Sequence, residues 1–143
     1  MAFVKGIHLI DNVIQVQEAL HSSFQRKEKG MLIKLDMKNA FDWVRLSILY
    51  EVLSSFGFST DFVCLIKACT DRPWITPLVN GRPTKLFQAT RGLHQGCPLS
   101  PFLYILMAES LSRKLSAKLA IGSLPSIKIA SGVNPINHAL FCG

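Results

Sequence analysis

An aspartate stands at the end of an apolar run that has the pattern of a β-strand. Alternate positions from 31 to 35 are apolar, which predicts a strand over Met31–Asp36 with at least one buried face. Where a strand ends, solvent can enter, so Asp36 can stay ionised and hold a metal ion at the edge of a sheet. Phe41 follows five residues later and would lie over the same opening. The alternative is that Asp36 caps a helix that begins near residues 42–45.

A second cluster, residues 90–101, combines two glycines, a glutamine and two prolines. Gly92 and Gly96 permit close approach of the backbone to a ligand, and Gln95 between them offers both a donor and an acceptor. The end of the cluster is explained by a helix start with Ser100 as the N-cap, followed by a proline. That explanation does not account for the Arg-Gly-x-x-Gln-Gly pattern, which therefore indicates a binding loop.

Together the two clusters resemble the reverse transcriptases of non-LTR, LINE-type retrotransposons, especially those of plant nuclear genomes. The resemblance rests on ordered stretches at family-like spacings: Lys34–Asp42, Leu78–Gly81, Arg91–Pro101 and Phe102–Glu109, with Phe3–Gly6 and Ile10–Asn12 as an upstream motif. It runs from about Phe3 to Phe141, nearly the whole chain. It implies one partial reverse transcriptase domain over residues 1–143, in which residues 1–30 are a remnant of the fingers and residues 31–143 an incomplete palm.

The resemblance also implies a chemistry, nucleotidyl transfer through two Mg²⁺ ions held by three carboxylates. By this carry-over Asp36 is the catalytic, metal-binding acid, and the backbone carbonyl of Met37 reaches the second ion. Asp42, although typical of the family, is assigned to a helix cap. The implied partners are an RNA template, a DNA primer and deoxynucleoside triphosphates.

The remaining implied roles concern the incoming nucleotide. Phe41 matches the steric gate, whose ring fills the space that a ribose 2′-hydroxyl would need. Gln95 and Gly96 match residues that line the nascent base pair. Arg91 is assigned to a phosphate contact, with a surface salt bridge as the alternative.

The sequence departs from the family at several positions. Residues 136–142 resemble the approach to the Asp-Asp hairpin that supplies the other two carboxylates, but Gly143 stands where the first aspartate is expected. Ile7, His94 and Cys97 also replace residues frequent in the family. With one carboxylate of three, we expect weak Mg²⁺ binding and no polymerisation by this polypeptide alone. Two alternatives stay open: a remnant that binds nucleic acid without chemistry, and a chain that does not fold stably because its sheet keeps an open edge.

Local patterns predict the elements that position these residues. Helices are expected over residues 11–26, 46–56, 59–69 and 101–118, and strands over residues 31–36, 74–79, 84–89, 127–130 and 139–141. Asp11 is the predicted cap of the first helix, and Gly30 and Gly57 are predicted helix terminators. Asn80-Gly81 is the strongest hairpin signal, and Pro77 and Pro83 confine its strands to a sheet edge.

These elements predict an α+β fold, an antiparallel sheet with helices on one face. The resemblance makes this sheet the palm of a right-hand polymerase and places the thumb beyond Gly143. On the third predicted helix, Phe62, Val63, Leu65 and Ile66 are the expected buried side chains.

Composition agrees with a nucleic-acid partner without proving one. The 143 residues carry a net charge of +7, which suits a polyanion. A mean hydropathy of +0.30 is high for a small soluble protein and favours a piece of a larger core.

The longest apolar stretch, Phe102–Ala108, is too short to span a bilayer, and no secretory signal is evident, so we expect an intracellular, nuclear protein. The four cysteines show no zinc spacing and are expected to be reduced thiols.

Overall fold

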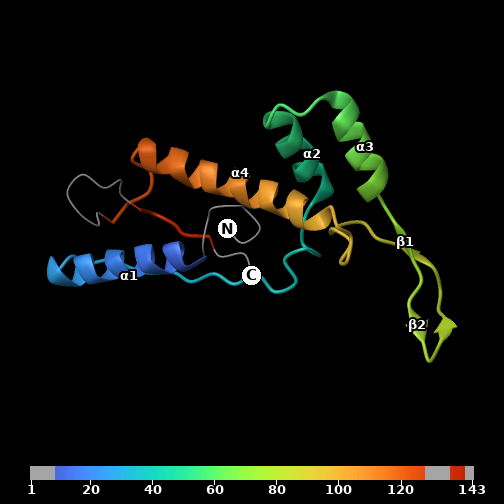
Figure 1. The fold of residues 1–143 in the computed structure, drawn as a ribbon, viewed down its shortest axis with the longest axis horizontal. Coiled ribbons are helices and arrows are strands. Elements are labelled where there is room, and N and C mark those ends of the chain that lie inside the picture. Colours follow the sequence, from blue (N-terminus) through green and yellow to red (C-terminus); the bar gives the residue numbers. More distant parts are fainter. Residues whose placement is uncertain (1–8, 128–135, 141–143) are drawn as a thin grey trace. The chain divides into compact units, whose positions relative to one another are not determined.

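Four helices and two short antiparallel strand pairs form the regular structure of the described residues. The computed structural model describes residues 9–127 and 136–140 (Figure 1). Its contacts divide the chain into two units, residues 36–107 and residues 1–35 with 108–143. The elements are α1 (Leu9–Gln25), α2 (Leu46–Ser55), α3 (Thr60–Thr70), β1 (Trp74–Ile75), β2 (Leu78–Val79), β3 (Arg82–Pro83), β4 (Phe87–Gln88) and α4 (Ser100–Ala120).

The helices α2 and α3 form where they are predicted, because each has a local end signal. Gly57 follows the C-cap of α2 with φ of +85°, and the Phe58 N–H donates to the Leu53 carbonyl at 3.2 Å, which closes that helix end. The Ser59 hydroxyl accepts from the Phe62 N–H at 3.3 Å and caps α3. The two helices lie side by side (Figure 1).

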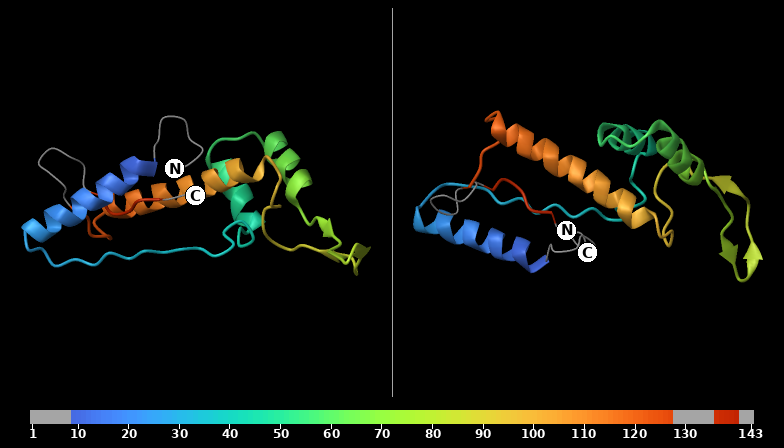
Figure 2. Two further views of the ribbon diagram at one scale, coloured as in Figure 1. Left: turned by 60° about the horizontal axis from the view of Figure 1, so that its bottom comes forward. Right: turned by 45° about the horizontal axis from the view of Figure 1, so that its top comes forward.

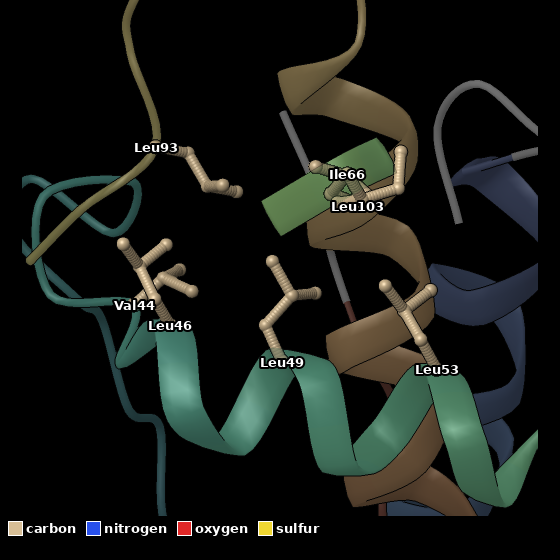
Figure 3. Close-up of a cluster of buried hydrophobic side chains, with 7 residues drawn as sticks. All are labelled: Val44, Leu46, Leu49, Leu53, Ile66, Leu93 and Leu103. Carbon is tan, nitrogen blue, oxygen red and sulfur yellow. The ribbon is translucent and has the colours of Figure 1, made fainter. Parts of the chain in front are cut away.

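Seven buried apolar side chains form the core of the unit 36–107. They come from the turn before α2, from α2 and α3, from the loop before α4, and from α4 itself: Val44, Leu46, Leu49, Leu53, Ile66, Leu93 and Leu103. In Figure 3 the side chains of α2 face Leu93, Ile66 and Leu103. Val44 follows the first sequence cluster and Leu93 belongs to the second, so the core joins the two clusters.

The burial predicted for α3 is only partly confirmed. Ile66 is buried and Val63 is half-buried, but Leu65 and Phe62 are exposed. Three or four residues separate neighbours on one face of a helix, so only the stripe that contains Val63 and Ile66 faces α2. Phe62 instead stacks on Phe58, with ring centroids 5.0 Å apart.

Asn80 and Gly81 form the predicted hairpin turn. Their φ angles of +49° and +75° are those of a tight turn in which both central residues are left-handed. In the inner strand pair Leu78 faces Pro83 and Val79 faces Arg82, and in the outer pair Trp74 faces Gln88 and Ile75 faces Phe87.

The register of this hairpin changes by one residue between its two strand pairs. The Thr84 N–H donates to the Pro77 carbonyl at 2.9 Å, which continues the inner register. Between that bond and the Ile75–Phe87 pair, Thr76 alone therefore opposes both Lys85 and Leu86. This is a β-bulge, and it divides the predicted long strands into two-residue pairs.

The helix α4 covers the predicted range, but Ser100 is not its capping residue. Its hydroxyl donates to the His94 carbonyl at 2.7 Å, and the residue is buried. The predicted N-cap bond is therefore replaced by a bond that ties the first turn of α4 to the preceding loop.

The strand predicted over Met31–Asp36 is not formed. This segment is irregular chain, light blue in Figure 2, and Met31 and Leu35 are 79% and 86% exposed. A strand needs a neighbour for its backbone N–H and C=O groups, and no described residue pairs with this segment. Apolar alternation alone does not supply that neighbour.

The helix α1 matches its prediction, but both predicted end signals are wrong. Asp11 lies within the first turn of α1. At the other end Lys27, with φ of +54°, takes the left-handed position, and the Glu28 N–H donates to the Ser23 carbonyl at 3.1 Å. The chain thus leaves the helix before it reaches Gly30.

The last described segment has one backbone pairing and several side-chain bonds. Ile127 and Ile136 form an isolated antiparallel bridge. Ala139 and Leu140 have no regular structure, and residues 128–130 and 141 of the two predicted strands lie outside the described residues. The Asn12 side chain of α1 donates to the Leu140 carbonyl at 2.9 Å.

His138 links this segment to α4. Its Nε2 lies 2.8 Å from the Ser112 hydroxyl, and its Nδ1 lies 2.6 Å from Oδ1 of Asn137. The Asn137 amide nitrogen donates to the Leu115 carbonyl at 3.0 Å, so Oδ1 is the atom that faces the ring. Because that oxygen can only accept, the neutral ring carries its proton on Nδ1 and accepts from Ser112 at Nε2.

The α+β class is confirmed in coarse form: the described residues combine helices with small antiparallel strand pairs. The assignment of residues 1–30 to fingers and 31–143 to palm stays a prediction. None of the described helices is both long and apolar enough to cross a membrane.

The environment of His138 predicts a pH dependence. Burial lowers the pKa of His138 below its ordinary value of 6.5. As pH falls, the unfolded chain therefore binds the proton first. The stability that the neutral His138 ring contributes is complete above pH 6.5, and it is lost between pH 6.5 and the lower folded-state pKa. We expect an NMR titration midpoint below 6.5 for His138, and a loss of stability on acidification that His138→Gln reduces. The exposed His21→Gln is the control, and an equal effect of both variants would contradict the assignment.

Candidate functional site

Two backbone hydrogen bonds hold the predicted binding loop against the segment that follows Asp36. The Gly92 N–H donates to the Val44 carbonyl and the Leu93 N–H donates to the Phe41 carbonyl, both at 2.9 Å. We call this pairing the Gly92 clamp. It brings together two segments that are far apart in the sequence and that contain most of the predicted site residues.

The clamp requires glycine at position 92. Gly92 has φ of +94°, which residues with a Cβ rarely adopt. A Cβ added there would lie 3.0 Å from the Asp42 Cα and 3.1 Å from the Asp42 carbonyl oxygen. The close approach predicted for this glycine is therefore made to the protein's own backbone.

Phe41 is held from two sides. Its carbonyl belongs to the clamp, and its ring is tilted by 32° against Tyr104 of α4 with centroids 4.9 Å apart. Asn39, with φ of +54°, accepts from the Asp42 N–H at 2.9 Å and makes the turn that presents this ring. The half-buried ring has a defined position, whereas its predicted role as a steric gate stays a prediction.

Asp42 contacts the binding loop. The Gln95 amide nitrogen donates to Asp42 Oδ1 at 3.1 Å, between two exposed side chains. The prediction that Asp42 caps a helix is wrong, because Arg45 occupies the N-cap of α2 and makes no side-chain cap bond. No spacing within either cluster signals this contact, since it depends on how the two clusters pair.

Asp36 is exposed and takes no part in this contact. Among the described residues it makes no hydrogen bond or ion pair, and none links it to Gln95 or Gly96. The alternative role as a helix cap is wrong, because α2 begins only at Leu46. The described part of the chain contains no group of three His, Cys, Asp or Glu side chains that could hold a metal ion. The metal-binding roles of Asp36 and the Met37 carbonyl therefore stay predictions.

Arg91 lies over an aromatic ring. Its guanidinium carbon is 4.2 Å from the centroid of Trp43, which is 59% exposed. The alternative of a surface salt bridge is not supported, since none of the ion pairs among the described residues involves Arg91. Trp43 belongs to neither sequence cluster, and its position directly after Asp42 gives no signal of its own.

Gly96 has open surroundings, whereas other residues of the loop line a cavity. Gly96 is exposed with φ of +84°, and an added Cβ would meet nothing within 4 Å. A cavity of about 270 Å³ adjoins other parts of the loop, lined by Cys69, Thr70, Pro73, Gly92, His94, Cys97, Leu99, Ser100 and Leu103. Gln95 and Gly96 are exposed and are not among its lining residues.

The two glycines of the loop provide a matched test of the clamp. Gly92→Ala and Gly96→Ala both place a side chain at positive φ, but only the first meets the Asp42 backbone. We expect Gly92→Ala to reduce the free energy of unfolding by about 1–3 kcal/mol more than Gly96→Ala, in urea melts followed by circular dichroism. Equal losses would show that the contact with Asp42 does not constrain the fold.

Comparison with known proteins agrees with the sequence resemblance. The model of the family described as reverse transcriptase (RNA-dependent DNA polymerase) matches residues 1–133. The chain is 31% identical over 106 residues to the transposon TX1 uncharacterized 149 kDa protein of Xenopus laevis, which covers 74% of this chain and 8% of that protein. It is 26% identical over 121 residues to the retrovirus-related Pol polyprotein from type-1 retrotransposable element R2 of Popillia japonica, covering 84% of this chain and 20% of that protein.

A shorter and closer match is an uncharacterized mitochondrial protein of Arabidopsis thaliana, 44% identical over 64 residues. These residues are 45% of this chain and 52% of that protein. The chain thus spans about half of the Arabidopsis protein and a fifth or less of the two transposon proteins. No solved structure matches the chain. The family match over nearly the whole sequence, with transposon relatives of the R2 and TX1 kinds, shows that this chain belongs to the reverse transcriptase family, in its non-LTR, LINE-type group.

Proposed function

We propose that this chain is part of the polymerase domain of a LINE-type retroelement, an RNA-directed DNA polymerase that extends a DNA primer along an RNA template. The observation that carries the proposal is the Gly92 clamp. It holds the segment of Phe41 and the loop of Gln95 against each other, as a site built from both clusters requires.

Four residues of this region are proposed to meet the incoming deoxynucleoside triphosphate. The Phe41 ring is fixed by Tyr104 and can act as a steric gate. The Gln95 amide nitrogen is used by Asp42, so its oxygen is left to accept from a ligand. Gly96 leaves open space for a nucleotide, and Arg91 carries the charge for a phosphate.

The residues present do not complete a site for two Mg²⁺ ions. Asp36 is an exposed carboxylate, a suitable hard ligand, and the Met37 carbonyl can add an oxygen. The sequence contains nine acidic residues and no adjacent acidic pair, and its described part holds no three-ligand cluster. We therefore propose that these 143 residues, by themselves, bind Mg²⁺ weakly and do not polymerise.

A second candidate function is nucleic-acid binding without chemistry. It is favoured by the net charge of +7 and by the exposed pair of Trp43 and Arg91. Both candidates share the same polyanionic partner and differ in whether nucleotides are joined.

Binding and primer extension separate the two candidates. We expect the chain to bind a fluorescent RNA–DNA template-primer with an affinity that falls steeply as salt increases, because phosphate contacts release counterions. We expect no extended primer on gels in the presence of Mg²⁺ and deoxynucleotides. A template-dependent product would contradict the proposed inactivity, and absence of binding at low salt would contradict both candidate functions.

Paramagnetic Mn²⁺, used in place of Mg²⁺, tests the metal-binding role of Asp36 without any activity assay. At millimolar Mn²⁺ we expect NMR signals of Asp36 and Met37 to broaden selectively, because carboxylate and carbonyl oxygens bind such cations. Asp36→Asn should abolish this broadening. Asp61→Asn, which removes an exposed carboxylate in α3, should leave it unchanged. Broadening that persists in Asp36→Asn would rule out Asp36 as the ligand.

A further inference from the structure

Trp43 and Arg91 form an exposed planar pair beside the Gly92 clamp. The guanidinium carbon lies 4.2 Å from the indole centroid, within the range of a cation–π contact. Trp43 keeps 59% of its surface exposed, and Arg91 is exposed as well. An indole and a guanidinium are both planar groups on which nucleic-acid bases can stack.

The backbone beneath this pair is fixed. Trp43 lies between Phe41 and Val44, whose carbonyls accept the two bonds of the clamp, and Arg91 directly precedes Gly92. Val44 and Leu93 are buried in the core and anchor both sides. The pair is thus partly organised before any ligand arrives, which reduces the entropy lost on binding.

The charge of Arg91 is not neutralised by an ion pair within the described residues. Lys38 and Arg45, both exposed, stand near Trp43 in the sequence, and Asp42 is engaged with Gln95. The guanidinium therefore retains N–H donors for a phosphate oxygen while the indole offers an aromatic surface.

We infer that Trp43 and Arg91 form a stacking platform for an unpaired nucleotide of single-stranded nucleic acid. The base stacks on the planar pair, and Arg91 also contacts a phosphate. An unpaired strand is the fitting partner because bases within a duplex are already stacked on their neighbours. This inference rests on the proposed function, and it adds a contact surface for the strand.

The chain has two tryptophans, so Trp74→Phe leaves Trp43 as the only indole fluorophore. In that variant we expect (dT)12 or (rU)12 to quench Trp43 emission in step with the fluorescence anisotropy of the labelled oligonucleotide. Trp43→Ala should weaken binding about five- to 100-fold, and Trp43→Phe much less, because a ring remains. Trp74→Ala, which removes a similarly exposed aromatic ring from β1, is the matched control and should leave the affinity unchanged.

Arg91 is tested through its salt dependence. Arg91→Ala should weaken binding and reduce the slope of log affinity against log salt by about one, and Arg91→Lys should preserve the slope. Oligonucleotide binding with unchanged Trp43 emission and unaltered affinity of Trp43→Ala would overturn the platform and leave the proposed function intact. Equal competition by a 12-base-pair duplex would overturn the stacking contact. No binding of any oligonucleotide would overturn both.

Discussion

The close approach of Gly92 to Asp42 is the constraint on which the site geometry depends. Without a side chain at position 92, the backbones can come near enough for two hydrogen bonds. Those bonds set the positions of Phe41, Trp43 and Gln95 relative to one another, and the buried Val44 and Leu93 hold the pairing in the core. The absence of a side chain at Gly92 therefore determines how these site residues are arranged.

Features set by local backbone chemistry were predicted well. Ser59 caps α3 and Gly57 ends α2, because a hydroxyl and a left-handed glycine act on their own neighbours. The Asn80-Gly81 turn forms for the same reason. The end of α1 was predicted less accurately. Gly30 is the predicted terminator, but α1 ends at Gln25 and Lys27 takes the left-handed position.

Features that depend on a distant partner were not predictable from local pattern. The alternation over Met31–Asp36 is that of a strand, but pairing needs a neighbour that no described residue supplies. The resemblance supplied the residue types of the site, but not the contact of Asp42 with Gln95 or of Trp43 with Arg91. Those contacts arise when two clusters meet, and neither cluster encodes them alone.

The bulge in the hairpin shows that chain length determines which side chains share a face. With two residues opposing Thr76, Phe87 pairs with Ile75 and lies on the same face as Val79, while Trp74 and Leu78 lie on the other. If the inner register continued without the bulge, Phe87 would pair with Trp74 and turn to the opposite face. The bulge therefore absorbs the one extra residue of the returning strand and keeps Phe87 on the face of Ile75 and Val79.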